Sequence, residues 1–130
     1  MTDLPTDRKY TDQHEWILVE GATATVGITD YAQNQLTDIV FVELPEVGRV
    51  VTAGESMAVL ESVKSVADIY APVAGEISAV NSELEDHPEK VNDDAFGAGW
   101  IVKLKVESPD LSALLDAEGY RAFTAEQGEG

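Results

Sequence analysis

Lys64 is the residue whose type and position most strongly indicate chemistry in this sequence. The chain has 8 Lys and Arg residues and 25 Asp and Glu residues, so basic side chains are few and acidic ones predominate. The apolar runs 57–60 and 66–70 on either side of Lys64 predict the two strands of a hairpin. The bend at 61–65 would then hold the Lys64 amine at a tip, away from the core.

The composition of this bend favours a function for the tip beyond turning the chain. Tight hairpin turns usually contain Gly or Asn, and residues 61–65 contain neither. A primary amine at the end of a defined, protruding structure suits acylation by an enzyme that activates a carboxylic acid as an adenylate. From the residues alone, the hypothesis is post-translational acylation of Lys64. The alternative is an ordinary solvated lysine.

The other residue types with chemical potential offer no second reactive site. The absence of cysteine excludes disulfides, thiol catalysis and cysteine-based metal sites. His14 and His87 have no partner at zinc spacing, and the acidic stretch 83–94 lacks the residue order of a calcium loop. Because no nucleophile–base pair is visible either, we predict a protein without catalytic residues or a metal site. We expect 83–94 to be a solvated, partner-facing loop.

Short strands separated by turn residues are predicted for most of the chain. Thr29 and Asp30 form an N-cap pair for a short helix at about 29–37. The continuous apolar run 39–42 predicts a strand that is buried on both faces. The expected strands cover residues 16–19, 22–28, 39–42, 49–52, 57–62, 66–71, 76–80 and 100–106.

Residues 45–50 and 72–77 form two copies of a weak internal repeat. Each copy has Pro, then Gly three positions later, then a strand, and the copies lie 27 residues apart. In the same register Gly54 corresponds to Asn81, and both residue types tolerate positive φ. The repeat predicts a mainly β fold, a flattened barrel or sandwich with pseudo-twofold symmetry. Chance recurrence of a short pattern is the alternative.

Length and charge limit the class of protein. The 130 residues fit a single domain with a core at about 8–107. C-terminal helices are expected at about 109–125, with Leu111, Leu114 and Leu115 on one face, and residues 126–130 are expected to form a frayed tail. The formal charge of −17 works against binding to nucleic acid or anionic membranes. Without a signal peptide or a long apolar segment, we expect a soluble, cytoplasmic monomer.

Residues 59–77, which surround Lys64, read VLESVKSVADIYAPVAGEI. This run resembles the lipoylation site of glycine cleavage system H proteins, and the resemblance covers about residues 8–123 in order. Further matching segments are HEW at 14–16, VGITD at 26–30, VFVELPEVG at 40–48, VN at 80–81 and GW at 99–100. The resemblance implies the flattened barrel-sandwich hybrid of lipoyl and biotinyl carriers.

The resemblance further implies a carrier in glycine catabolism and not an enzyme. Lipoate would be attached covalently to Lys64, and Glu61 and Gly75 match the acidic residue and the glycine that lipoate-attaching enzymes recognise. The lipoyl-lysine would take an aminomethyl group from glycine decarboxylase (P protein) to the tetrahydrofolate-dependent aminomethyltransferase (T protein). Its electrons would then pass to dihydrolipoyl dehydrogenase (L protein).

In this family the loaded arm can fold into a surface cleft that protects the aminomethyl group. By the resemblance, Glu15, Asp68 and the segment from Ile28 to Gln35 would line this cleft. Many relatives have His at the positions of Tyr31 and Gln35, so different groups would hold the arm here.

Three interpretations remain open from the sequence. The first is the lipoyl carrier of glycine cleavage. The second is another carrier of the same fold, either an H-like protein that relays lipoate to other enzymes or another lipoyl or biotinyl carrier. Biotin sites usually place Met beside the lysine, whereas Val63 and Ser65 flank it here. The third is an acidic β-domain that serves as an interaction module, with Lys64 unmodified.

Overall fold

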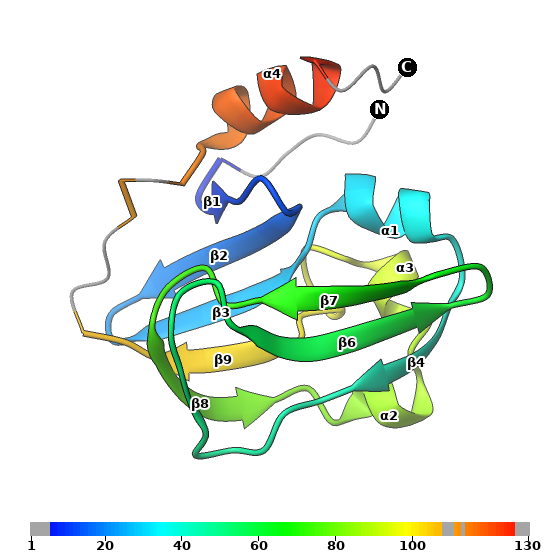
Figure 1. Ribbon diagram of the computed structural model, residues 1–130, viewed down its shortest axis with the longest axis horizontal. Helices are drawn as coiled ribbons and strands as arrows, with labels where there is room; N and C mark the ends of the chain where they lie inside the picture. Colours follow the sequence, from blue (N-terminus) through cyan, green and yellow to red (C-terminus); the bar gives the residue numbers. More distant parts are fainter. Residues whose placement is uncertain (1–5, 108–110, 113, 127–130) are drawn as a thin grey trace.

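The computed structural model describes residues 6–107, 111–112 and 114–126, and these form two antiparallel β-sheets with short helices around them (Figure 1). The six-stranded sheet has the order β1 (Lys9–Tyr10), β2 (Glu15–Glu20), β3 (Thr23–Ile28), β9 (Val102–Lys105), β8 (Gly75–Val80), β5 (Val50–Val51). The three-stranded sheet has the order β4 (Ile39–Glu43), β6 (Ser56–Ser62), β7 (Val66–Tyr70). The helices are α1 (Asp30–Leu36), α2 (Glu83–Asp86), α3 (Lys90–Asp93) and α4 (Ala117–Glu126).

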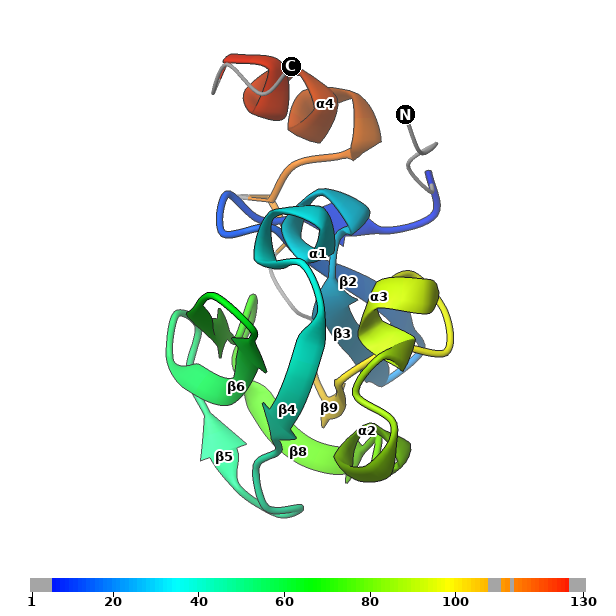
Figure 2. The ribbon, with the colours of Figure 1, turned by 90° about the vertical axis from the view of Figure 1, so that its right-hand side faces the viewer.

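Two groups of buried side chains hold the fold together. The main core lies between the sheets and contains aliphatic residues from both, such as Val26, Leu60 and Leu104, each fully buried. A second, aromatic cluster joins Tyr10 and Trp16 to Tyr120 of α4. Figures 1 and 2 show α4 lying over β1, at the β1 edge of the six-stranded sheet. None of the described helices has the length and apolarity that crossing a bilayer requires.

The helix predicted at about 29–37 is present as α1, and its caps are those that the sequence indicates. The Thr29 side chain accepts a hydrogen bond from the Ala32 N–H, which satisfies a free amide of the first turn. The helix ends at Thr37, whose φ of 65° is uncommon for a β-branched residue.

The apolar run at 39–42 forms β4, but the prediction that both of its faces are buried is wrong. Ile39 and Val42 are buried, whereas Val40 is 54% and Phe41 is 48% exposed. A β-bulge between Ile39 and Phe41 gives this strand two adjacent exposed residues. The physical reason for the difference is that β4 is an edge strand of a sheet with only one covered face.

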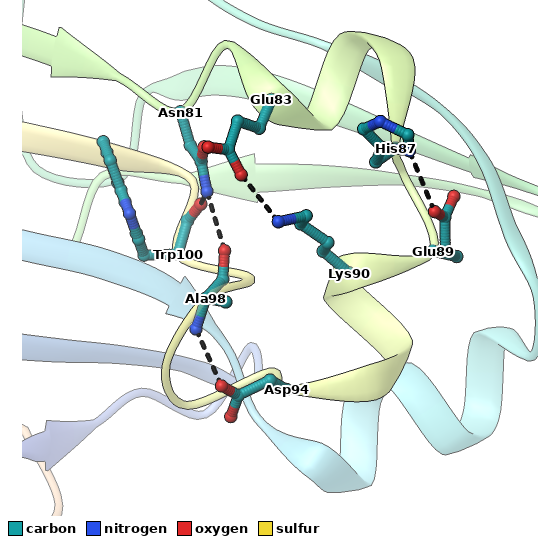
Figure 3. Close-up of polar contacts among 8 residues, drawn as sticks. All are labelled: Asn81, Glu83, His87, Glu89, Lys90, Asp94, Ala98 and Trp100. Atoms are coloured by element: carbon teal, nitrogen blue, oxygen red, sulfur yellow. Dashed lines mark hydrogen bonds and ion pairs between the residues drawn. The ribbon is translucent and has the colours of Figure 1, made fainter.

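The acidic stretch 83–94 is also more ordered than the predicted solvated loop. It forms α2 and α3, which are anchored by the buried side chains of Leu84 and Val91. Figure 3 shows how polar contacts close this region: Lys90 Nζ donates to Glu83 Oε1 at 2.6 Å, and Asp94 Oδ2 accepts from the Ala98 N–H at 2.9 Å. Single apolar residues between acidic ones give too weak a periodicity to reveal such short helices.

The strands of the two repeat copies pair with each other. Val50 and Val51 of β5 lie opposite Glu76 and Gly75 of β8, and the Ile77 N–H donates to the Arg49 carbonyl at 2.8 Å. The pairing between the two copies stays the same when the copies are exchanged, as pseudo-twofold symmetry requires.

The expected match between Gly54 and Asn81 does not extend to backbone conformation. Gly54 has a φ of 87°, but Asn81 is not among the positive-φ residues. Asn81 is buried, and its side-chain amide donates to the carbonyls of Ala98 and Trp100, each at 2.8 Å (Figure 3).

The C-terminal part of the chain is helical only in α4 among the described residues. The expected helical face of Leu111, Leu114 and Leu115 is not formed, because Leu115 bridges to Tyr10 through two backbone hydrogen bonds of 2.7 and 2.8 Å. A residue whose amide and carbonyl are taken by a strand cannot also continue a helix. The expected tail falls on Glu126, the last residue of α4, and on 127–130, which lie outside the described residues.

Candidate functional site

The hairpin predicted around Lys64 is formed by β6 and β7. The two strands are paired from Ser56 opposite Tyr70 to Glu61 opposite Val66, with a bulge near the open end. Only the short connection between Ser62 and Val66 lies outside the strands, so Lys64 is at its tip (Figure 1).

Two serines build the turn that the sequence leaves without Gly or Asn. The Ser62 N–H donates to the Ser65 carbonyl at 2.8 Å, and the Ser65 N–H donates to Ser62 Oγ at 3.0 Å. Neither Val63 nor Lys64 has a positive φ, so the turn does not need a glycine. The tip is therefore a defined turn, closed by a backbone hydrogen bond and a side-chain hydrogen bond between the two serines, for which the sequence carries no local signal.

A third strand fixes the tip from the side. The Val63 N–H donates to the carbonyl of Asp38, the residue that precedes β4, at 3.2 Å. Asn92 of α3 holds this segment on both sides of Asp38, since its Nδ2 donates to the Thr37 carbonyl at 2.8 Å and its Oδ1 accepts from the Ile39 N–H at 2.9 Å. Asn92 thus links α3 to the tip. A single polar residue in an acidic stretch carries no sequence signal for this role.

The Lys64 side chain itself is exposed. Among the described residues its ammonium group has no hydrogen bond or ion pair, and its neighbour Val63 is 73% exposed. The geometry fits a covalent group, because the amine is reachable by an enzyme and attachment breaks no existing interaction.

The two residues expected to guide attachment lie in different environments. Glu61 is half-buried on β6, next to the tip, with Phe41 and Val66 as its cross-strand neighbours. Gly75 opens β8, which starts at the end of the molecule where β7 finishes, away from the tip (Figure 1). A Cβ at Gly75 would lie 2.8 Å from the Lys105 carbonyl oxygen, so glycine is required here by the approach of β9.

Glu15, the first of the expected cleft residues, lines a surface pocket of about 510 Å³ together with Gln13, Tyr70 and Phe123. Its carboxyl group is almost fully buried, with Oε1 accepting from the Thr11 hydroxyl at 2.8 Å and Oε2 accepting from the Tyr70 N–H at 2.9 Å. Burial raises the pKa of Glu15 to about 7, and the two hydrogen bonds only partly oppose this shift.

The structure does not bring the other expected cleft residues into this pocket. Asp68 is exposed on β7, where it accepts a hydrogen bond from the Ser56 hydroxyl at 3.1 Å. Ile28 is a core residue and Gln35 is exposed on α1.

Tyr31, one of the two positions for which the resemblance implies a different residue, packs against His14. The two ring centroids are 4.6 Å apart. His14 Nδ1 also lies 2.7 Å from the Tyr120 hydroxyl, within hydrogen-bonding distance, and burial lowers the pKa of His14. Across the part of the chain that the structure describes, no group of three or more His, Asp or Glu side chains could hold a metal ion.

Two packed antiparallel sheets with an exposed lysine on a protruding hairpin define a carrier domain of the lipoyl type. The glycine cleavage H-protein family model matches residues 8–127 of this chain. The chain therefore belongs to the glycine cleavage H-protein family.

Individual relatives agree with this assignment. The chain is 63% identical over 120 residues to a glycine cleavage system H protein of Thermus thermophilus, covering 92% of this chain and 94% of the relative. It is 53% identical over 131 residues to that of Mycolicibacterium vanbaalenii, covering 97% of this chain and all of the relative. The crystal structure of the H protein from Mycobacterium marinum matches with a TM-score of 0.84 and 40% identity, over 97% of this chain and all of that one.

These findings confirm the first of the three interpretations. The chain is a lipoyl carrier of the glycine cleavage system, a non-catalytic subunit in glycine catabolism, and its fold is the lipoyl-type barrel-sandwich hybrid. As part of that system its partners are the P, T and L proteins. The family carries lipoyl-lysine.

Proposed function

We propose that Lys64 is the residue that carries the lipoyl group. The observation that carries this proposal is the exposed amine, without a partner in the described part of the chain, on an ordered hairpin tip. When attached, the lipoyl group would supply the sulfur chemistry that accepts the aminomethyl group and, once that group has been transferred, gives up two electrons to dihydrolipoyl dehydrogenase. The protein holds the base of the arm in place, while the arm itself stays free to reach one enzyme after another.

Two further features of the chain support this role: the absence of cysteine and the hydrogen bonds that hold the tip. It contains no cysteine, so no protein thiol competes in exchange with the sulfurs of the arm. The turn hydrogen bonds of Ser62 and Ser65 and the bond from Val63 to Asp38 restrict the backbone at the tip. Motion is thereby confined to the lysine side chain and the group on it.

We further propose that the lipoate-attaching enzyme contacts and recognises Glu61 directly, since Glu61 lies beside the tip. Gly75 would act indirectly, by allowing β8 and β9 to pack closely. For the loaded arm, Asp68 and Gln35 are accessible from solvent, whereas Glu15 and Ile28 would shape the cleft from beneath.

We also propose that the chain acts as one carrier domain, as a cytoplasmic monomer that binds neither nucleic acid nor membranes. Its net charge of −17 favours encounters with basic protein surfaces and opposes encounters with phosphate-rich ones.

A reconstituted glycine cleavage reaction tests the proposal for Lys64. Lys64→Arg keeps the charge but removes the acylable amine, so we expect no aminomethyl transfer above background while the circular dichroism spectrum stays that of the wild type. Lys105→Arg, at an exposed lysine on β9, is the matched control and should keep full activity. Transfer by the Lys64→Arg variant would refute the proposal.

A further inference from the structure

The outer face of the three-stranded sheet has an exposed apolar patch beside the lysine tip. We define the tip patch as Val40, Phe41, Val63 and Val66, each at least 48% exposed. Phe41 lies opposite Glu61, and Glu61 lies opposite Val66, so the three side chains form one row across β4, β6 and β7. Directly opposite residues have Cβ atoms about 5 Å apart, so Phe41 and Val66 lie on either side of Glu61 in this row.

Carboxylates surround and interrupt the tip patch. Glu61 lies within its central row, and the next row on the same face runs from Glu43 through Val59 to Asp68. Asp38, exposed beside the tip, adds another carboxylate. Lys64 is the single basic residue in 38–43 and 56–70, the segments that make up the sheet and its tip.

No described element covers this face. In Figure 1 the strands β6 and β7 lie in front of the six-stranded sheet, and in Figure 2, after a quarter turn, the space outside β6 is again free of other elements. Large apolar side chains in an uncovered cluster mark an interaction surface. The structure therefore presents an apolar patch with an acidic rim, directly at the base of the arm.

We propose that the tip patch is the docking surface for the enzyme that attaches lipoate to Lys64. This enzyme would meet the patch with an apolar centre and a rim of Lys and Arg side chains, which complements the carboxylates. The inference rests on the proposed function, because it takes Lys64 as the attachment site.

The position of the reacting atom favours this enzyme over those that act on the finished arm. Attachment forms the amide bond at Lys64 Nζ as the acyl–phosphate bond of a lipoyl-adenylate breaks, AMP leaves and the amine releases two protons. The active site must then come within one lysine side chain of the tip backbone, where it would cover Val63 and Val66. Enzymes that act on the sulfur atoms work at the far end of the arm and need not cover this face.

The experiment measures lipoylation of the unmodified protein by a purified lipoate ligase with lipoate and ATP. Initial rates are followed by intact mass over a range of protein concentrations. Phe41→Thr/Val66→Thr removes apolar surface and keeps residues suited to strands. We expect KM for the protein to rise about tenfold, with kcat within about twofold of the wild type. In the wild type, added salt should also raise KM, because it screens the carboxylates.

Matched controls separate docking from general effects. Val47→Thr/Val50→Thr alters two equally exposed valines (61% and 70%) outside the three-stranded sheet and should change KM less than twofold. Val66→Thr alone serves if thermal unfolding shows that the double variant does not fold. An unchanged KM in the tip-patch variants, or an equal rise in the control, would overturn the proposal.

Two further measurements show which proposal fails. If the wild type is not lipoylated on Lys64 at all, the proposed function fails. If the wild type is lipoylated normally but the tip-patch variant matches it, the docking proposal alone fails. After complete lipoylation, the double variant should keep its KM for glycine decarboxylase within about twofold. A rise as large as with the ligase would overturn the assignment to the attaching enzyme.

Discussion

At the scale of single residues, Glu15 shows how a buried carboxyl group can shape the behaviour of a carrier. It connects Thr11 to the backbone of Tyr70 and so ties the N-terminal strand to the end of the lysine hairpin. The sequence resemblance indicated a residue of the cleft, but periodicity could not reveal that the side chain is nearly fully buried and already bonded at both oxygens.

The raised pKa of Glu15 predicts a pH-dependent stability. Its pKa of about 7 in the folded state lies above the ordinary 4.5, so the folded chain keeps a proton that the unfolded chain releases. The contribution of Glu15 to the free energy of unfolding is fully present below about pH 4.5. It is lost as the pH rises through 7, and the total loss is about 3 kcal/mol. In urea unfolding, Glu15→Gln should reduce the loss of stability between pH 5 and pH 8 by about this amount.

The control for this prediction is Glu76→Gln, at an exposed position of β8. It should lose stability between the two pH values as the wild type does. An equally steep loss in Glu15→Gln would show that Glu15 is not the titrating group.

At the scale of elements, Asn92 links α3 to the lysine hairpin through the segment that contains Asp38. Its side chain makes hydrogen bonds to Gln33, Thr37 and Ile39, and the Asp38 carbonyl in turn holds the Val63 amide. Because Thr37 has a positive φ, these bonds also stabilise an unfavourable backbone conformation.

Removal of this link should loosen the tip and leave the core intact. Asn92→Ala is expected to cost about 1–3 kcal/mol in urea unfolding, since backbone groups lose their partner. Hydrogen exchange at the Val63 amide should speed up by at least tenfold more than exchange at Leu104 in the core. Asn34→Ala, at an exposed position of α1, is the control and should change neither. Unaltered protection of the Val63 amide would contradict the link.

Elements with strong local signals were predictable, and those defined by distant contacts were not. The caps at Thr29 and the apolar runs around Lys64 identified α1 and the hairpin, because capping and alternation are local. The exposure of Phe41 depends on which face of the sheet stays uncovered, and the extended course of Leu115 depends on Tyr10, more than 100 residues away. No local sequence pattern predicts the exposure of Phe41 or the extended backbone at Leu115.

At the scale of the whole molecule, the carrier combines two packed β-sheets, the lysine tip and a net charge of −17. The internal repeat at 45–50 and 72–77 correctly indicated two symmetric strands, and these close the six-stranded sheet at β5 and β8. The C-terminal helix α4 covers β1 at the edge of that sheet, and neither chain end, as far as it is described, lies over the lysine tip (Figures 1 and 2).

The measurement that tests the central claim most directly is the intact mass of the protein purified from lipoate-replete cells, followed by fragmentation of the peptide that contains Lys64. We predict a single lipoyl increment, located on Lys64 and absent from the Lys64→Arg variant. A lipoyl group on another lysine, or no increment on a protein whose decarboxylase and ligase partners are active, would contradict the claim.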